Sequence, residues 1–187
     1  MHKLLTSAVL ILSFSQLQAT EPIKLPVPKE WRVENTSYPP PWAKTLPWRG
    51  TIQLRFPKGF FDPDNDFFWS YPILYQLQGD VIKTNPELKR GLIEYDAGLY
   101  GNKYPKAKIK IDFRPQITAE RYPTIVVDGF DPFTTNKPLR TWIVYHRRYE
   151  KETDTTTILL LRSSQTYDPE NHVWKTLQTT FGARTGF

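Results

Sequence analysis

Residues 139–162 read LRTWIVYHRRYEKETDTTTILLLR, and this stretch decides the fold. Its two ends are rich in branched and aromatic residues, which is typical of β-strands, and the polar run Glu150–Thr153 between them has the composition of a turn. Two long strands joined by a short turn pair as an antiparallel hairpin. We therefore expect the surrounding chain to form a mainly antiparallel sheet.

Further strands are predicted on the N-terminal side of this hairpin. Residues 108–114 (KIKIDFR) alternate between charged and apolar side chains, so this strand should bury one face and expose the other. Residues 51–56 (TIQLRF) alternate in the same way, with Arg55 on the polar side. Six strands are predicted in all, at 51–56, 67–77, 108–114, 124–127, 139–149 and 154–162.

Two helices are predicted beside the sheet. The first begins where Thr84 or Asn85 can cap it and Pro86 supplies the helical φ, and its apolar stripe is Leu88, Leu92, Tyr95 and Leu99. Gly91 and Gly98 fall on the same side, which suggests that this helix lies very close to the sheet. The second helix is predicted to start near Asp168, with the stripe Val173, Trp174, Leu177 and Phe181.

These elements predict an α+β domain, a six-stranded mainly antiparallel sheet packed with two helices. In element order the chain resembles the α/β/α sandwich of PsbP-like proteins. The strings Pro40–Gly50, Phe60–Pro63 and Leu77–Asp80 are similar to a family of uncharacterised exported bacterial proteins. These resemblances imply a fold and a compartment, and no activity.

The N-terminus has the layout of a cleavable signal peptide over residues 1–19. Lys3 precedes the apolar run Leu4–Phe14, and Ala19 offers a small residue for cleavage. We expect export to the periplasm or beyond, followed by a proline- and aromatic-rich extended arm at 20–50 and a single α+β domain at 51–187. The chain has no cysteine, and no later apolar run is long enough for a transmembrane span.

Composition and motifs disfavour several function classes. The net charge of +6 is scattered along the chain, so no nucleic-acid-binding stripe is expected. Asp62, Asp64 and Asp66 resemble the opening of a calcium loop, but Phe67 and Ile73 stand where that loop needs Gly and Glu, so a turn is favoured over a metal site. No cofactor motif is present.

Asp128 and Asp131 follow an apolar strand, where general acids and bases are often found. Together with His146 they are the candidate catalytic residues of a hydrolase that acts on exported carbohydrate or peptide. Asp128-Gly129 and Asp131-Pro132 are also ordinary turn dipeptides, and we favour that interpretation.

Aromatic residues make up 14 % of the chain, and four tryptophans, Trp31, Trp42, Trp48 and Trp69, lie in its first half. Exposed rings would bind a carbohydrate or protein partner, whereas buried rings would fix the arm to the domain. We expect burial for Trp42 and Trp48. The predicted function is a non-enzymatic exported domain that binds an envelope or extracellular partner, and the hydrolase is the alternative.

Overall fold

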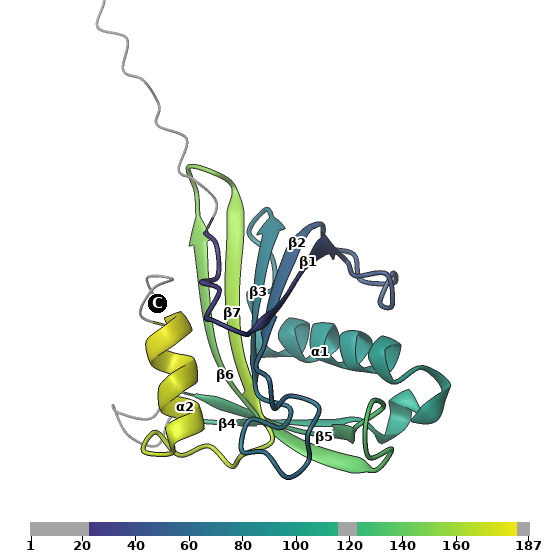
Figure 1. The fold of residues 1–187 in the computed structure, drawn as a ribbon. Coiled ribbons are helices and arrows are strands. Elements are labelled where there is room, and N and C mark those ends of the chain that lie inside the picture. Colours follow the sequence, from purple (N-terminus) through teal and green to yellow (C-terminus); the bar gives the residue numbers. More distant parts are fainter. Residues whose placement is uncertain (1–22, 116–122, 183–187) are drawn as a thin grey trace, which may run out of the picture.

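The computed structural model describes residues 23–115 and 123–182, so the predicted signal peptide at 1–19 lies outside the described residues. Seven strands form one antiparallel sheet in the order β1-β2-β3-β7-β6-β5-β4 (Figure 1). Their bounds are β1 Arg32–Tyr38, β2 Gly50–Phe56, β3 Tyr71–Gln78, β4 Lys110–Arg114, β5 Thr124–Phe130, β6 Pro138–Glu150 and β7 Thr155–Ser163. The α+β class and the antiparallel sheet are confirmed, and the predicted strand number of six is wrong.

The additional strand is β1, in the segment expected to be a proline-rich extended arm. Residues 32–38 (RVENTSY) show no alternation of apolar and polar side chains, because most of this edge strand is partly or fully exposed. β1 pairs with β2 over its whole length, from Arg32 opposite Phe56 to Tyr38 opposite Gly50. Backbone pairing rather than side-chain burial defines this strand. A strand is recognised in a sequence by its pattern of apolar residues, and residues 32–38 have no such pattern.

The two helices pack on opposite faces of the sheet (Figure 1). Helix α1, Asn85–Tyr100, begins with a capping box in which Thr84 and Glu87 bind each other's backbone N–H groups. Helix α2, His172–Leu177, continues as one π-helical turn, Gln178–Gly182, and its N-cap is Asn171 rather than the predicted Asp168. Two 3₁₀ turns, Gly101–Lys103 and Lys106–Lys108, connect α1 to β4.

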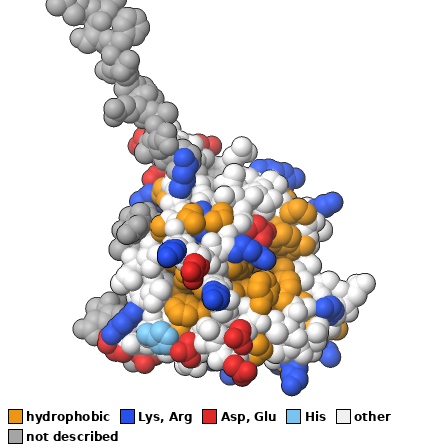
Figure 2. All heavy atoms as spheres, viewed as in Figure 1, with side chains coloured by type: hydrophobic (Ala, Val, Ile, Leu, Met, Phe, Trp, Pro, Cys, Tyr) orange, Lys and Arg blue, Asp and Glu red, His pale blue; other side chains and the backbone are white. Residues whose placement is uncertain are grey.

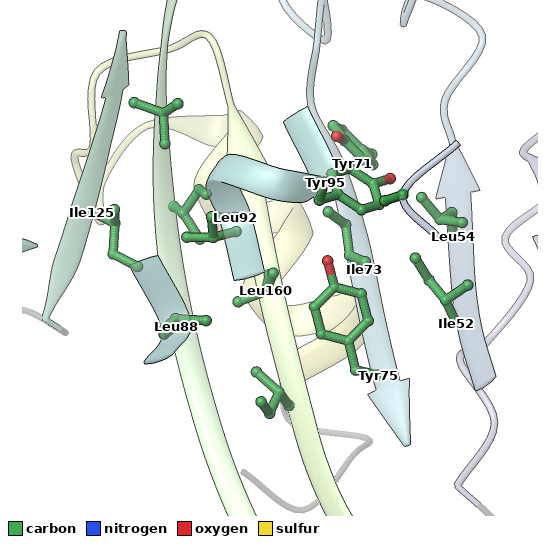
Figure 3. Packing of buried hydrophobic residues seen from close by; sticks show 14 of the residues in the cluster. Ile52, Leu54, Tyr71, Ile73, Tyr75, Leu88, Leu92, Tyr95, Ile125 and Leu160 are labelled. Atoms are coloured by element: carbon green, nitrogen blue, oxygen red, sulfur yellow. The ribbon is translucent and has the colours of Figure 1, made fainter. Parts of the chain in front are cut away.

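Each face of the sheet has its own hydrophobic core, and the central strands β3 and β7 contribute to both cores. Figure 3 shows the α1 side, where Leu88 and Leu92 lie over Leu160 of β7. On the other side Leu159 and Leu161 pack with the stripe of α2. No helix within the described residues is long and apolar enough to cross a membrane.

The second face of β2 is covered, contrary to the expectation that Arg55 points to solvent. Arg55 is 3 % exposed, and its guanidinium donates to the backbone carbonyls of Leu25 and Pro26 and to the Asn35 side chain. Residues 23–27 therefore lie across this face. A buried guanidinium is tolerated here because its N–H groups find acceptors in the backbone of that segment.

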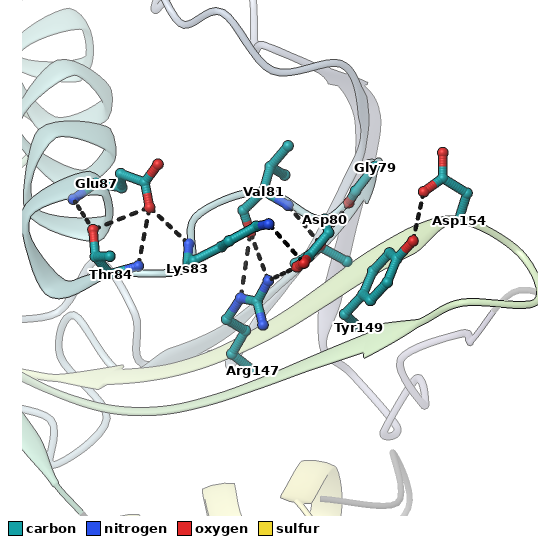
Figure 4. Close-up of polar contacts among 10 residues, drawn as sticks. Gly79, Asp80, Val81, Lys83, Thr84, Glu87, Arg147, Tyr149 and Asp154 are labelled. Atoms are coloured by element: carbon teal, nitrogen blue, oxygen red, sulfur yellow. Dashed lines mark hydrogen bonds and ion pairs between the residues drawn. The ribbon is translucent and has the colours of Figure 1, made fainter.

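The connection from β3 to α1 is held by polar contacts with β6 (Figure 4). Asp80 forms ion pairs with Lys83 and with Arg147 of β6. The Arg147 guanidinium also donates to the carbonyl of Val81, at 3.1 Å from Nη2. These contacts fix the position at which α1 starts.

The loop between β1 and β2 packs directly on α1. An added Cβ at Gly98 would stand 1.9 Å from the carbonyl oxygen of Trp42, and one at Gly91 would stand 3.2 Å from the Trp48 ring. The prediction that these glycines mark a close approach of the helix to the sheet is wrong, because their nearest neighbours lie in this loop. Trp48, 8 % exposed, is buried in the resulting contact.

We expect Gly98→Ala to lower the free energy of unfolding by about 1–3 kcal/mol, because the methyl group has no room beside the Trp42 carbonyl. Helix propensity alone would raise the free energy of unfolding by about 1 kcal/mol, because alanine favours a helix more than glycine does. Urea denaturation measures the change. Gly182→Ala is the matched control, since no described atom outside its own helical turn lies within 4 Å of its added Cβ; equal effects at the two sites would contradict the packing described above.

Candidate functional site

The strongest candidate site is an aromatic pocket of about 260 Å³ on the α1 face, beside the edge strand β1. The sheet supplies its floor, α1 and the β1–β2 loop supply one wall, and the loops before β3 and after β5 supply the other. Hydrophobic side chains gather at the surface on this side of the molecule, with basic and acidic side chains among them (Figure 2). The lining residues are Arg32, Glu34, Trp42, Leu54, Phe56, Phe60, Phe61, Tyr71, Tyr95, Leu99 and Phe133.

Two phenylalanines at this pocket are exposed to an unusual degree. Phe61 is 42 % exposed and Phe133 is 47 % exposed, and their ring centroids lie 5.8 Å apart in an edge-to-face arrangement. Large apolar side chains of this kind in a contiguous group often mark a binding surface. Of the other lining residues, Arg32 is exposed, Glu34, Trp42 and Leu99 are half-buried and the rest are buried, so the pocket has an aromatic interior and a partly apolar rim.

The interior carries tyrosine hydroxyls that stay neutral. Burial raises the pKa of Tyr71 to about 12 and raises the pKa of Tyr95 well above its ordinary value. Figure 3 shows these two side chains side by side above the sheet. Among the described residues, the charged side chains in the lining are therefore Arg32 and Glu34.

A buried ion pair next to the pocket holds α1 to the sheet. Arg162 of β7 and Asp96 of α1 are 1 % and 0 % exposed, and two parallel hydrogen bonds of 2.7 and 2.9 Å join them. The remaining guanidinium N–H groups reach Thr141 Oγ1 at 2.9 Å and, more distantly, the Tyr100 hydroxyl. This geometry satisfies both ions, as a buried pair requires.

The same network positions the rim of the pocket. The Arg162 guanidinium carbon lies over the Trp69 ring, 5.5 Å from the ring centroid. The indole Nε1–H of Trp69 donates to Asp131. Asp131 accepts three backbone N–H groups, those of Phe133, Thr134 and Thr135. It thereby fixes the turn that carries Phe133 to the pocket.

The four tryptophans considered as binding residues have different places. Trp42 is half-buried and lines the pocket, whereas Trp48 and Trp69 are buried packing residues. Trp31 is half-buried on the opposite face, where its ring contacts Phe67 and Phe181. Only Trp42 belongs to the candidate site.

The three candidate catalytic residues are not brought together. Asp131 is fully buried, and although burial acts to raise its pKa, hydrogen bonds from Thr135 hold that pKa below the ordinary value. Asp128 pairs with Arg140, whose hydrogen bond lowers the Asp128 pKa. His146 lies six residues beyond Arg140 on β6, about 20 Å along a strand.

The aspartates at 62–66 form turns. Asp62 Oδ1 accepts the backbone N–H of Asp64, and Asn65 Oδ1 accepts that of Phe67. Asp66 lies 3.3 Å from His172 at the surface. Within residues 23–115 and 123–182, no three His, Cys, Asp or Glu side chains are grouped so that they could hold a metal ion.

Several pocket residues were missed from the sequence, above all Arg32, Glu34 and Phe133. A charge pair two residues apart in a strand lies on one face of it, which is a usable signal once the strand is known. Residues 32–38 were not recognised as a strand, so that signal was lost. Phe133 has no local pattern and reaches the pocket only through the Asp131 turn.

Comparison of the chain with known protein families, with curated proteins and with solved structures finds no match. The resemblances noted in the sequence therefore stay predictions.

We expect Asp96→Leu and Arg162→Met, made singly, each to cost about 3–5 kcal/mol of unfolding free energy, because each leaves one buried charge or hydrogen-bonding group unpaired. The double variant should be more stable than either single variant, since both charges are then removed. Urea unfolding of the four proteins measures this as a double-mutant cycle. Additive losses would show that the pair is not coupled.

Proposed function

We propose that this chain is an exported, non-enzymatic binding domain that holds a small molecule, or one side chain of an envelope or extracellular partner, in the aromatic pocket beside β1. The pocket with its exposed Phe61 and Phe133 is the observation that carries the proposal. Export rests on the signal-peptide pattern of residues 1–19.

The geometry of the pocket favours binding over chemistry. Most of its lining is apolar and aromatic, with a few polar groups, which is the usual composition of a ligand site. Its volume of about 260 Å³ is below the range typical of drug-sized ligands, so the occupant should be compact.

The hydrolase alternative has less support. Asp128 and Asp131 both have lowered pKa values, whereas a general acid needs a pKa near the working pH. Neither carboxylate lines the pocket, and His146 does not line it either.

One pair of variants tests the proposal. A panel of compact molecules, which includes benzyl alcohol, indole and 3,3-dimethylbutan-1-ol, is screened by saturation-transfer NMR against the wild type and against Leu99→Trp. Leu99 lines the pocket at α1, so a larger side chain there should fill the space and abolish binding.

Val33→Trp is the matched control, because Val33 is 41 % exposed on β1 and does not line the pocket. It should bind the panel as the wild type does, and thermal melting checks that both variants are folded. The proposal fails if no compound binds the wild type, or if Leu99→Trp binds the same compounds equally well.

A further inference from the structure

The mouth of the pocket carries two opposite charges on the same strand. Arg32 and Glu34 are two residues apart on β1, so their side chains leave the same face, and they stand opposite Phe56 and Leu54 of β2. All four residues line the pocket. The strand register therefore places one guanidinium and one carboxylate at an aromatic cavity.

Neither charge has an ion-pair partner among the residues that the structure describes. The ion pairs and side-chain hydrogen bonds within residues 23–115 and 123–182 include neither Arg32 nor Glu34. The Arg32 guanidinium instead lies 5.3 Å from the ring centroids of both Phe56 and Phe61. Glu34 is half-buried, and a carboxylate in that position gains from a cationic partner.

The rings behind Glu34 suit one kind of cation. The faces of Trp and Tyr rings attract cations, and Trp42, Tyr71 and Tyr95 all line the cavity. A methylated ammonium is favoured over a primary one, because its methyl groups lose little hydration when they enter an apolar cavity. Glu34 adds the opposite charge at the edge of the same space.

Arg32 suits an anion at the other end of the occupant. A guanidinium held on two rings keeps N–H groups that can bind a carboxylate in a bidentate manner. The Trp42 indole Nε1 is buried and has no acceptor within the described part of the chain. Buried donors without acceptors are uncommon, and this donor belongs to a ring in the pocket wall.

We propose that the pocket binds a compact zwitterion, with a methylated ammonium group among the rings beside Glu34 and a carboxylate at Arg32. This inference rests on the proposed binding function and specifies its ligand class. A cation alone would make no use of the exposed Arg32, and an anion alone would make no use of the half-buried Glu34.

Four nearly isosteric probes separate the two charges. Trimethylglycine carries both charges and 3,3-dimethylbutanoate only the carboxylate, while choline carries only the ammonium and 3,3-dimethylbutan-1-ol neither. Titration calorimetry or ligand-observed NMR on the wild type should rank trimethylglycine first and the neutral alcohol last. Each charge is expected to tighten Kd by about fivefold, as for partly exposed ion pairs and cation–π contacts.

Two variants assign each preference to its residue. Glu34→Gln should remove the preference for trimethylammonium over the tert-butyl group and keep the preference for the carboxylate. Arg32→Gln should do the reverse. Glu152→Gln and Lys29→Gln, at exposed positions outside the pocket, are the charge-matched controls and should leave all four affinities unchanged.

Several outcomes would overturn the inference. Equal binding of the four probes, or binding of neutral panel compounds alone, would leave the binding function intact and refute the zwitterion. The alternative role for Glu34 is to neutralise Arg32 only. In that case Glu34→Gln would strengthen the binding of 3,3-dimethylbutanoate, and the wild type would not prefer the trimethylammonium group over the tert-butyl group. These two results together would also refute the zwitterion. Failure of every probe and every panel compound would refute the binding function itself.

Discussion

The ion pair between Arg162 and Asp96 is the interaction on which the arrangement of this molecule most depends. Arg162 stands on β7, a strand with both faces covered, and Asp96 stands on α1. Moving both ions out of water costs several kcal/mol each, and the two short parallel hydrogen bonds between them, together with the bond from Arg162 to Thr141, offset that cost. The helix can therefore take one rotation and one height above the sheet, because any other would separate the charges.

This constraint reaches the candidate site through a chain of direct contacts. Trp69 lies on the guanidinium and donates to Asp131, and Asp131 holds the turn that carries Phe133. On the helix, Tyr95 is the neighbour of Asp96 and lines the pocket. The opposite walls of the pocket are thus positioned by one buried pair, which gives a binding site rigid aromatic walls at small entropic cost.

Local patterns predicted the regular elements well, and long-range contacts decided what they missed. The hairpin of β6 and β7, the strand β4 and the capping box of α1 each have a signal within a few residues. β1 has none, because an edge strand with exposed faces needs only backbone partners. Asp96 lies on the buried side of α1 next to Tyr95, and a charged residue at such a position indicates a buried partner of opposite charge. That partner, Arg162, is 66 residues away in the sequence, so no local pattern identifies it.

The tryptophans show why the candidate site was only partly predictable. Burial as packing and exposure as a binding surface were treated as alternatives, and at Trp42 they are not exclusive. The Trp42 ring packs edge-to-face on Tyr95 and also lines the pocket. The backbone carbonyl of Trp42 lies against Gly98 of α1. Trp42 packs the β1–β2 loop against α1, and the same residue forms the wall of the pocket that remains between them. In a protein without disulfides the β1–β2 loop must be held by such packing, and so the residues that stabilise the loop also shape the pocket.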